Sequence, residues 1–262
     1  MGDRILLVAH IITNMGTFIG KYKLKYLFPR ALGILMIFNC CDGFFNWDKG
    51  DFIRKEVSLD TYNHIRIYGI YNIILKQDSI HQLTIEGAED IIADTEARVV
   101  NDTLSIRDIN RNLFRIEEMP TLCLHFTDLK YLWTFKPVKI TNEDTLKLDW
   151  FYFYPIGEIG EAQLTVLCNF FGMDNSANTL GKFSVKGTAQ NARFYNRYGS
   201  SIYADSLKSQ VVHVYNESIG DVYIYADEQL QIFIWGPGNI YHSGNAVPEI
   251  VEKKSSGMVV RL

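Results

Sequence analysis

The stretch "VVHVYNESIGDVYIYADEQL", residues 211–230, contains two short runs of alternating side chains with a turn between them. Its first run is repeated, with changes, in "ARFYN" (192–196) and "QIFIWG" (231–236). The aligned aromatic residues recur at a constant interval: Tyr195, Tyr215 and Trp235. Each precedes a residue type that tolerates a positive φ, which predicts one recurring tight turn at Asn196, Asn216 and Gly236.

The second run of this stretch repeats as well. The matching pairs are Ile202 and Tyr203, Val222 and Tyr223, and Ile240 and Tyr241. The last interval is two positions shorter than the one before it, because "GPG" makes a shorter turn than "NESIG". A period near 20 that holds two strands and two turns is typical of a solenoid with one rung per repeat. The sequence therefore predicts an all-β solenoid with rungs of about 20 residues.

Alternation along each strand predicts which side chains face the core. The small and aliphatic residues are expected to point inward: Val212, Val214, Val222, Ile224, Ile232 and Ile234. Their neighbours are expected to point outward: His213, Tyr215, Tyr223, Tyr225, Phe233 and Trp235. Rungs lie about 4.8 Å apart, so the aromatic residues should form two stacked ladders. The predicted ladders are Tyr195, Tyr215 and Trp235 on one sheet, and Tyr203, Tyr223 and Tyr241 on the other.

Two interpretations of these ladders remain open. Cross-rung aromatic pairs stabilise a sheet by roughly 0.2–1 kcal/mol each, so the ladders can be purely structural. Tyr and Trp also present apolar faces with polar rims, which suit a sugar ring or an extended peptide. In the second case Tyr215 and Trp235, with Tyr195, are expected to be partly exposed and to form the contact surface.

The rest of the chain after residue 51 is predicted to form further strands. Short alternating runs bounded by Gly, Asp, Asn and Ser occupy residues 64–77, 81–87, 102–108, 121–126 and 145–154. Residues 87–99 are the one helix candidate, with an irregular turn and two short strands as the alternative. Rungs between 130 and 185 repeat poorly. Because no linker separates two compositions, residues 40–262 are predicted to be one domain.

Residues 1–39 are predicted to be a lipoprotein signal peptide. A basic stretch, "KYKLKYLFPR", precedes the apolar run "ALGILMIF" (31–38), which is followed by "NCCDG". This apolar run is too short to cross a bilayer, which takes roughly 20 residues in a helix. We expect acylation of Cys40 or Cys41, and hence a membrane partner through a lipid anchor. A start at Met15 would shorten the leader, and the alternative is a buried core helix with two incidental cysteines.

Composition excludes some function classes. A net charge of −4 and a pI near 5.9 argue against a nucleic-acid partner, which clustered Lys and Arg would bind. Export would leave Cys123 and Cys168 in the mature chain, each inside a strand-like run, and two buried free thiols are expected. There is no C-x-x-C pair, so a structural zinc site has no support.

Catalytic and metal sites are not predicted. The acids available to a solenoid enzyme are Asp205, Asp221 and Asp227, with His213 nearby in the repeat, but no two carboxylates stack in one column. The other histidines after residue 51 are scattered singly: His64, His81, His125 and His242. No cofactor is expected, since "GTAQN" and "GPGN" lack the lysine and helix of a phosphate loop.

The chain resembles the "putative auto-transporter adhesin, head GIN domain" family. The resemblance rests on "YNHIRIYGIYNIILKQ" (62–77), "LTIEGAEDII" (83–92), "NDTLSIRD" (101–108) and the closing "IWGPGNIYHSGNAVPEIVEKKSSGMVVRL" (234–262). It spans about residues 40–262 and implies a right-handed, β-helix-like solenoid of two sheets without recognised catalytic residues. It departs from the family at the turns, where "GPG" and "YGS" stand in place of Gly-Ser-Gly.

The sequence therefore predicts a non-enzymatic, lipid-anchored protein of the cell envelope, held at the outer membrane. Its expected role is adhesion, with a glycan or a protein as the partner at a surface. A polysaccharide-acting solenoid enzyme and a structural envelope scaffold are the alternatives. The sequence predicts no oligomeric state.

Overall fold

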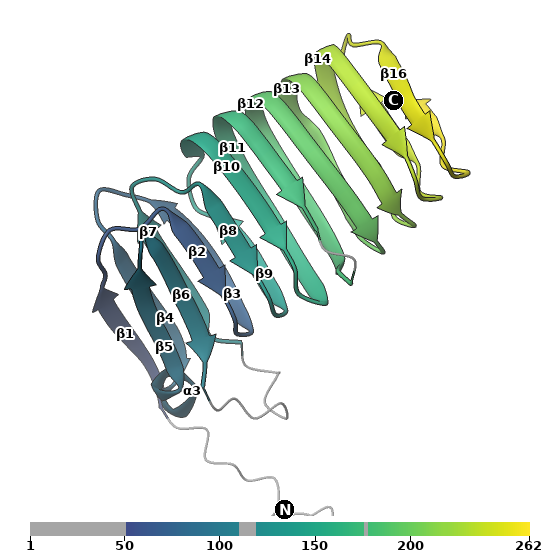
Figure 1. Ribbon diagram of the computed structural model, residues 1–262. Helices are drawn as coiled ribbons and strands as arrows, with labels where there is room; N and C mark the ends of the chain where they lie inside the picture. Colours follow the sequence, from purple (N-terminus) through teal and green to yellow (C-terminus); the bar gives the residue numbers. More distant parts are fainter. Residues whose placement is uncertain (1–50, 110–118, 176–177) are drawn as a thin grey trace, which may run out of the picture. The chain divides into compact units, whose positions relative to one another are not determined.

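The computed structural model describes residues 51–109, 119–175 and 178–262 of the chain. These residues form an all-β solenoid of about six turns, which confirms the predicted fold class (Figure 1). The leader, Cys40 and Cys41 lie outside the described residues.

The strands of the first face run from one end of the stack to the other. In spatial order they are β1 (Phe52–Ser58), β4 (Gln82–Ala88), β7 (Thr121–Phe126), β3 (Tyr71–Gln77) and β9 (Val138–Asn142), then the first parts of β11 (Ile159–Asp174), β12 (Leu180–Tyr198), β13 (Ser201–Ser218) and β14 (Val222–Ile234), then β15 (Ile240–Ser243) and β17 (Val259–Arg261).

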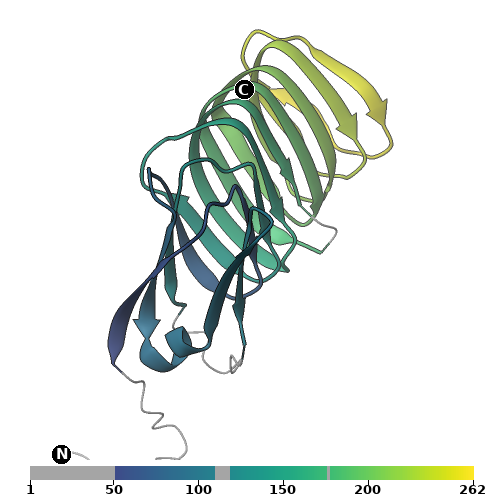
Figure 2. The same ribbon diagram turned by 60° about the vertical axis from the view of Figure 1, so that its left-hand side comes forward.

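The second face is built in the same way. In order it holds β5 (Thr95–Val100), β6 (Thr103–Asp108), β2 (His64–Ile67), β8 (Tyr131–Thr134) and β10 (Leu146–Pro155), then the later parts of β11 to β14, then β16 (Pro248–Lys253). The strands β11 to β14 curl from one face to the other, so hydrogen bonds join both faces into one 17-stranded sheet (Figure 2). The two separate sheets expected from the family are thus continuous in this chain.

The N-terminal rungs do not follow chain order. The rung built by β6 and β7 lies outside the rung built by β2 and β3, because β2 pairs with both β6 and β8, and β3 with both β7 and β9. Beyond it, β1, β4 and β5 pair antiparallel, and the helix α3 (Glu89–Ala93) buries Ile91 and Ile92. The helix candidate at 87–99 is thus one short helix followed by β5.

The core lies between the two faces and confirms the predicted alternation. Val212, Val214, Val222, Ile224, Ile232 and Ile234 are all fully buried. The middle rungs are filled by larger rings instead, including Phe151, Phe171, Phe183 and Phe194. Phe151 and Phe171 meet edge to face with their centroids 5.9 Å apart. Between residues 130 and 185 the inward residues change from Val and Ile to Phe. The repeat is therefore hard to recognise in the sequence, although the backbone rungs continue.

The predicted role of the turn residues is wrong. Neither Asn196, Asn216 nor Gly236 has a positive φ. Both asparagines are fully buried, and the Nδ2 of Asn216 donates to the carbonyls of Gly238 at 2.9 Å and Gly220 at 3.3 Å. Asn196 Nδ2 donates to Asn216 Oδ1 at 3.0 Å. The asparagine amide donates hydrogen bonds to turn carbonyls that are shielded from water. Each of these carbonyls, left without a hydrogen bond, would destabilise the fold by about 1–3 kcal/mol.

Both described cysteines, Cys123 and Cys168, are free thiols, as predicted, but only Cys168 is buried and Cys123 is half-buried. No described helix combines the length and the apolar character needed to cross a membrane.

Candidate functional site

The first-face ladder consists of Tyr203, Tyr223 and Tyr241. These residues are register partners on β13, β14 and β15. The ring centroids of Tyr203 and Tyr223 lie 5.0 Å apart and those of Tyr223 and Tyr241 4.6 Å apart, each pair tilted by 8°. All three rings are half-buried on the outer side of the sheet. The structure thus brings these three sequence-predicted residues together as one stack.

The second-face ladder differs from the predicted one in its last member. Tyr195 and Tyr215 stack at 4.1 Å, but the next ring in the column is Phe233, which lies 4.3 Å from Tyr215 and is its register partner. Trp235 lies beside the column, tilted by 55° and 5.7 Å from Tyr215. The prediction of one column through Tyr195, Tyr215 and Trp235 is therefore wrong at Trp235.

A bulge in β13 causes this shift. Before the bulge Ile202 pairs with Val222, as the repeat predicts, whereas after it Val212 pairs with Leu230 instead of the predicted Ile232. The register shifts between Ala204 and Val211, where β13 contains two residues more than the segment of β14 that pairs with it. The rest of β14 is displaced by two residues as a result. A shift of two keeps every side chain on its predicted face.

Charged side chains border the second-face ladder. Trp235 donates from Nε1 to Glu252 at 2.6 Å, and the ammonium of Lys254 lies 5.2 Å from the indole centroid. The guanidinium of Arg197 lies 5.3 Å from the ring of Tyr195. Partial burial raises the pKa of Tyr195, so its hydroxyl stays protonated at neutral pH. The ladder therefore presents half-buried rings with a charged rim.

A second aromatic group on the same face was missed by sequence reasoning. Tyr154 stacks on Trp133 at 5.6 Å and on Tyr152 at 4.4 Å, and the guanidinium of Arg66 lies 5.1 Å from the Trp133 ring. The aromatic runs "YLWT" and "WFYFY" are visible in the sequence, but the repeat is poor in this region, so the pairing of these strands could not be predicted. Asp174, the register partner of Tyr195, separates this group from the ladder.

A groove of about 530 Å³ opens on the first face next to Tyr203. Its lining residues are Thr141, Asn142, Glu161, Gln163, Leu164, Thr165, Lys182, Ser184, Val185, Lys186, Tyr203, Asp205 and Ser206. Most of them are polar, and the tyrosine is the one aromatic residue among them. The groove thus joins the open end of the first-face ladder to a polar surface.

Two irregularities in neighbouring strands form this groove. The pairing of β12 with β13 shifts between Ser184 and Gly187, and that of β13 with β14 shifts after Ala204. Gly187 has a φ of +115°, and a Cβ atom there would lie 1.9 Å from the Val166 carbonyl oxygen, so only glycine fits. β-Bulges often lie next to binding sites, where they redirect side chains.

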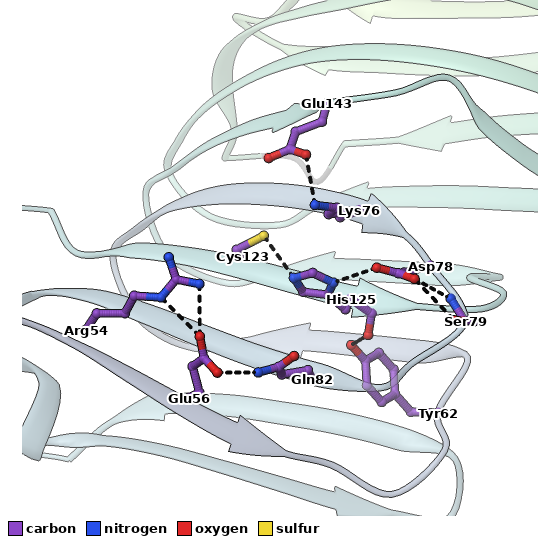
Figure 3. A network of polar contacts seen from close by, with 10 residues as sticks. All are labelled: Arg54, Glu56, Tyr62, Lys76, Asp78, Ser79, Gln82, Cys123, His125 and Glu143. Carbon is purple, nitrogen blue, oxygen red and sulfur yellow. Dashed lines mark hydrogen bonds and ion pairs between the residues drawn. The ribbon is translucent and has the colours of Figure 1, made fainter.

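A polar network around Cys123 lies at the N-terminal end of the first face (Figure 3). The Sγ of Cys123 is 3.5 Å from His125 Nε2, and His125 Nδ1 is 3.2 Å from Asp78 Oδ2. Nearby, Lys76 pairs with Glu143 at 3.3 Å. Sequence reasoning missed this cluster, although the spacing of Cys123 and His125 puts both on one side of β7.

The geometry of this network is that of a nucleophile, a base and an orienting acid, but its electrostatics differ. Burial, and then the nearby charge of Glu143, raise the pKa of the Cys123 thiol. Reactive cysteines have a lowered pKa because the thiolate is the nucleophile. The bonds from Ser79 and His125 hold the pKa of Asp78 below its usual value. Cys123 therefore stays a thiol at neutral pH, as part of a packed network.

The candidate acids from the sequence have separate roles. Asp205 lines the groove. Asp221 accepts from the Asn239 amide at 2.8 Å, and Asp227 accepts from the Tyr225 hydroxyl at 2.9 Å. His213 lies on the second face beside Arg193, and burial with that charge lowers its pKa. Within residues 51–109, 119–175 and 178–262, no group of three or more His, Cys, Asp or Glu side chains is placed to hold a metal ion.

Comparison with known proteins gives a family and a fold. The family model "Putative auto-transporter adhesin, head GIN domain" matches residues 61–246. A "putative adhesin" from Bacteroides fragilis NCTC 9343 has a TM-score of 0.74 and 20% identity, over 81% of this chain and 97% of that one. A "putative lipid binding protein" from Parabacteroides distasonis ATCC 8503 has a TM-score of 0.61 and 18% identity, over 81% and 97%. No curated protein matches the chain.

Proposed function

The chain belongs to the auto-transporter adhesin, head GIN domain family, and from this premise we propose that it is a non-catalytic adhesin of the cell envelope. The observation that supports this most is the pair of outward aromatic ladders. Their rings lie 4.1–5.0 Å apart and remain half-buried, with no strand of the described residues over them. Side chains that face water on a sheet are usually Thr, Lys or Glu, so stacked Tyr and Phe favour a contact surface.

Two contact surfaces are proposed, one on each face: Tyr195, Tyr215 and Phe233 with the neighbouring Trp235 on the second face, and Tyr203, Tyr223 and Tyr241 on the first. Rigid aromatic side chains lose little conformational entropy on binding. Their polar rims, such as Glu252 at Trp235, add directional hydrogen bonds. The expected partner is a glycan or a protein at a surface. One structural relative is named as a lipid-binding protein, but a lipid bound to these ladders would contact the charged residues at their rim.

A lipid anchor at Cys40 or Cys41 is the second part of the proposal. The support is the order of basic, apolar and cysteine residues between 21 and 41. An acyl chain on that cysteine would place the solenoid at the outer membrane, in the periplasm or on the cell surface. One acyl chain binds a membrane weakly, so stable anchoring requires at least two.

A polysaccharide-acting enzyme is the alternative class. It has less support, because Asp221 and Asp227 are engaged in turn and side-chain hydrogen bonds and the pKa of Cys123 is raised. A structural envelope scaffold shares the anchor but needs no partner. A surface-binding assay therefore separates the scaffold from the adhesin, and an assay of sugar reducing ends separates the enzyme from both.

The experiment uses full-length protein expressed in a bacterium with a lipoprotein pathway. We expect labelling by a palmitate analogue, loss of label in Cys40→Ala/Cys41→Ala, and binding of the purified chain to intact cells or extracted surface glycans. The matched comparison is Tyr215→Ala/Phe233→Ala against Tyr225→Ala, which removes an outward tyrosine outside the ladders. Label that persists in the double cysteine variant overturns the anchor. Equal surface binding by all variants overturns the second-face contact surface.

A further inference from the structure

The first-face groove ends at the exposed end of a tyrosine stack. Tyr223 covers one side of the Tyr203 ring at 5.0 Å. On the other side the register partner of Tyr203 is Ser184, whose side chain is too small to stack. The ladder therefore stops at Tyr203 because β12 offers no ring, and the side of Tyr203 away from Tyr223 faces the groove, where the Lys182 ammonium is its neighbour.

We propose that this groove binds a neutral oligosaccharide, with one sugar ring stacked on Tyr203. The inference rests on the proposed adhesin function and names the chemical class of its partner. A sugar has an apolar face of C–H groups and a rim of hydroxyls. It thus matches a site with one aromatic platform and a polar wall.

The polar wall favours a polyhydroxylated ligand over an apolar one. Amide and hydroxyl groups line it: Asn142, Gln163, Thr141, Thr165, Ser184 and Ser206. The Asn142 amide already bonds to the Thr165 backbone, whereas the Gln163 amide, which donates to Glu161 at 3.2 Å, has a second N–H and an oxygen that can bind sugar hydroxyls. A lipid chain in the groove would cover the polar groups that water or a sugar can bond, at a cost of about 1–3 kcal/mol for each one left without a partner.

The charges in the groove argue for a neutral ligand. Two ammonium groups, Lys182 and Lys186, line the groove together with two carboxylates, Glu161 and Asp205. Their formal charges cancel, so the groove has no net attraction for an anionic sugar. The Lys182 ammonium lies 5.0 Å from the Tyr203 centroid, so a sugar ring that stacks on Tyr203 displaces this exposed side chain.

The size of the groove fits a short oligosaccharide. Its volume of about 530 Å³ lies within the roughly 300–1,000 Å³ that is usual for small-molecule sites. The register shifts between Ser184 and Gly187 and after Ala204 lie within its lining. Since these shifts belong to the backbone, the groove exists before a ligand arrives, which lowers the entropic cost of binding.

The test fills the groove by extending the ladder. Ser184→Tyr places a fourth ring on Tyr203, so the fold should gain stability while the site is lost. The probes are maltohexaose, cellohexaose and mannohexaose, with a heparin hexasaccharide as the anionic control, measured by saturation-transfer NMR and titration calorimetry on the full chain. We expect a Kd of about 10 μM to 1 mM for one neutral probe.

We expect Ser184→Tyr and Tyr203→Leu to weaken that Kd at least about tenfold, which corresponds to ~1.4 kcal/mol. Tyr154→Leu removes an outward ring of the second face, outside both the groove and the ladders, and should change the Kd less than about twofold. Tyr203→Leu keeps the test informative if Ser184→Tyr does not fold. Tighter binding of heparin than of every neutral probe overturns the neutral class. No binding by any probe at about 10 mM, well above the expected Kd, or equal binding by Ser184→Tyr, overturns the site.

The same variants separate this inference from the proposed function. If the wild-type chain binds cell surfaces and Ser184→Tyr binds them equally, the groove inference fails while adhesion stands. If the wild-type chain binds the oligosaccharide but no cell surface, the groove inference stands and adhesion fails.

Discussion

At the scale of the residue, burial decides what Cys123 can do. Its Sγ lies 3.5 Å from an imidazole nitrogen that is oriented by a carboxylate, which is the arrangement of a nucleophile and its base. Desolvation opposes the thiolate, however, and Glu143 adds a nearby negative charge. A contact of the right geometry therefore does not make a reactive group unless the charged form is also stabilised.

We predict that iodoacetamide modifies Cys123 slowly at pH 7. Because its pKa is raised, the thiolate should form only above the usual value of about 8.5, and the rate should rise with pH beyond that point. Burial raises the pKa of Cys168 to about 12, so that residue should react more slowly still. Peptide mass spectrometry over pH 6–10 measures each rate separately. Modification of Cys123 at pH 7 that is faster than in an unfolded control would restore the interpretation as a nucleophile.

At the scale of the element, strand bulges decide which side chains meet. The bulge in β13 contains two extra residues, so Phe233, rather than Trp235, pairs and stacks with Tyr215. The same bulge carries Asp205 and Ser206 into the groove wall. One local irregularity thus sets both the last ring of the second-face ladder and one side of the candidate site.

A double-mutant cycle tests this register. We predict a coupling of about 0.5–1.5 kcal/mol between Tyr215→Ala and Phe233→Ala, since parallel aromatic rings at 4.3 Å interact directly. The matched cycle of Tyr215→Ala with Trp235→Ala should give a smaller value, because that pair is tilted and 5.7 Å apart. Urea unfolding of the single and double variants supplies the free energies. A larger coupling to Trp235 would mean that the spacing predicted from the repeat holds through the last rung in solution.

At the scale of the whole molecule, the two ends of the described solenoid differ. The N-terminal end is closed by antiparallel strands and by α3, which buries Ile91 and Ile92. At the other end, Ile250 lies in the same inward column as Ile232 but is 51% exposed, because no described rung covers it. Each rung is thus buried mainly by its neighbours, as in other repeat proteins.

This difference predicts unequal costs for the same truncation. Ile232→Ala should lower the free energy of unfolding by about 2–5 kcal/mol, because the side chain is fully buried. Ile250→Ala should cost only about 1 kcal/mol, since half of its surface already faces water. Chemical denaturation of the two variants provides the comparison. Equal costs would show that another copy or another segment covers the last rung in solution.

The sequence alone determined the solenoid, the inward and outward faces and the family, because alternation and the regular repeat survive in the order of residues. Tertiary structure alone decided the partner of Tyr215, the buried amides of Asn196 and Asn216, the groove and the Cys123 network. The alternation of inward and outward residues has a period of two. A shift of the strand register by two residues leaves this alternation unchanged, so the sequence pattern does not reveal the shift. The groove and the network join residues from several strands, so their positions depend on registers and bulges that are fixed only when the rungs stack.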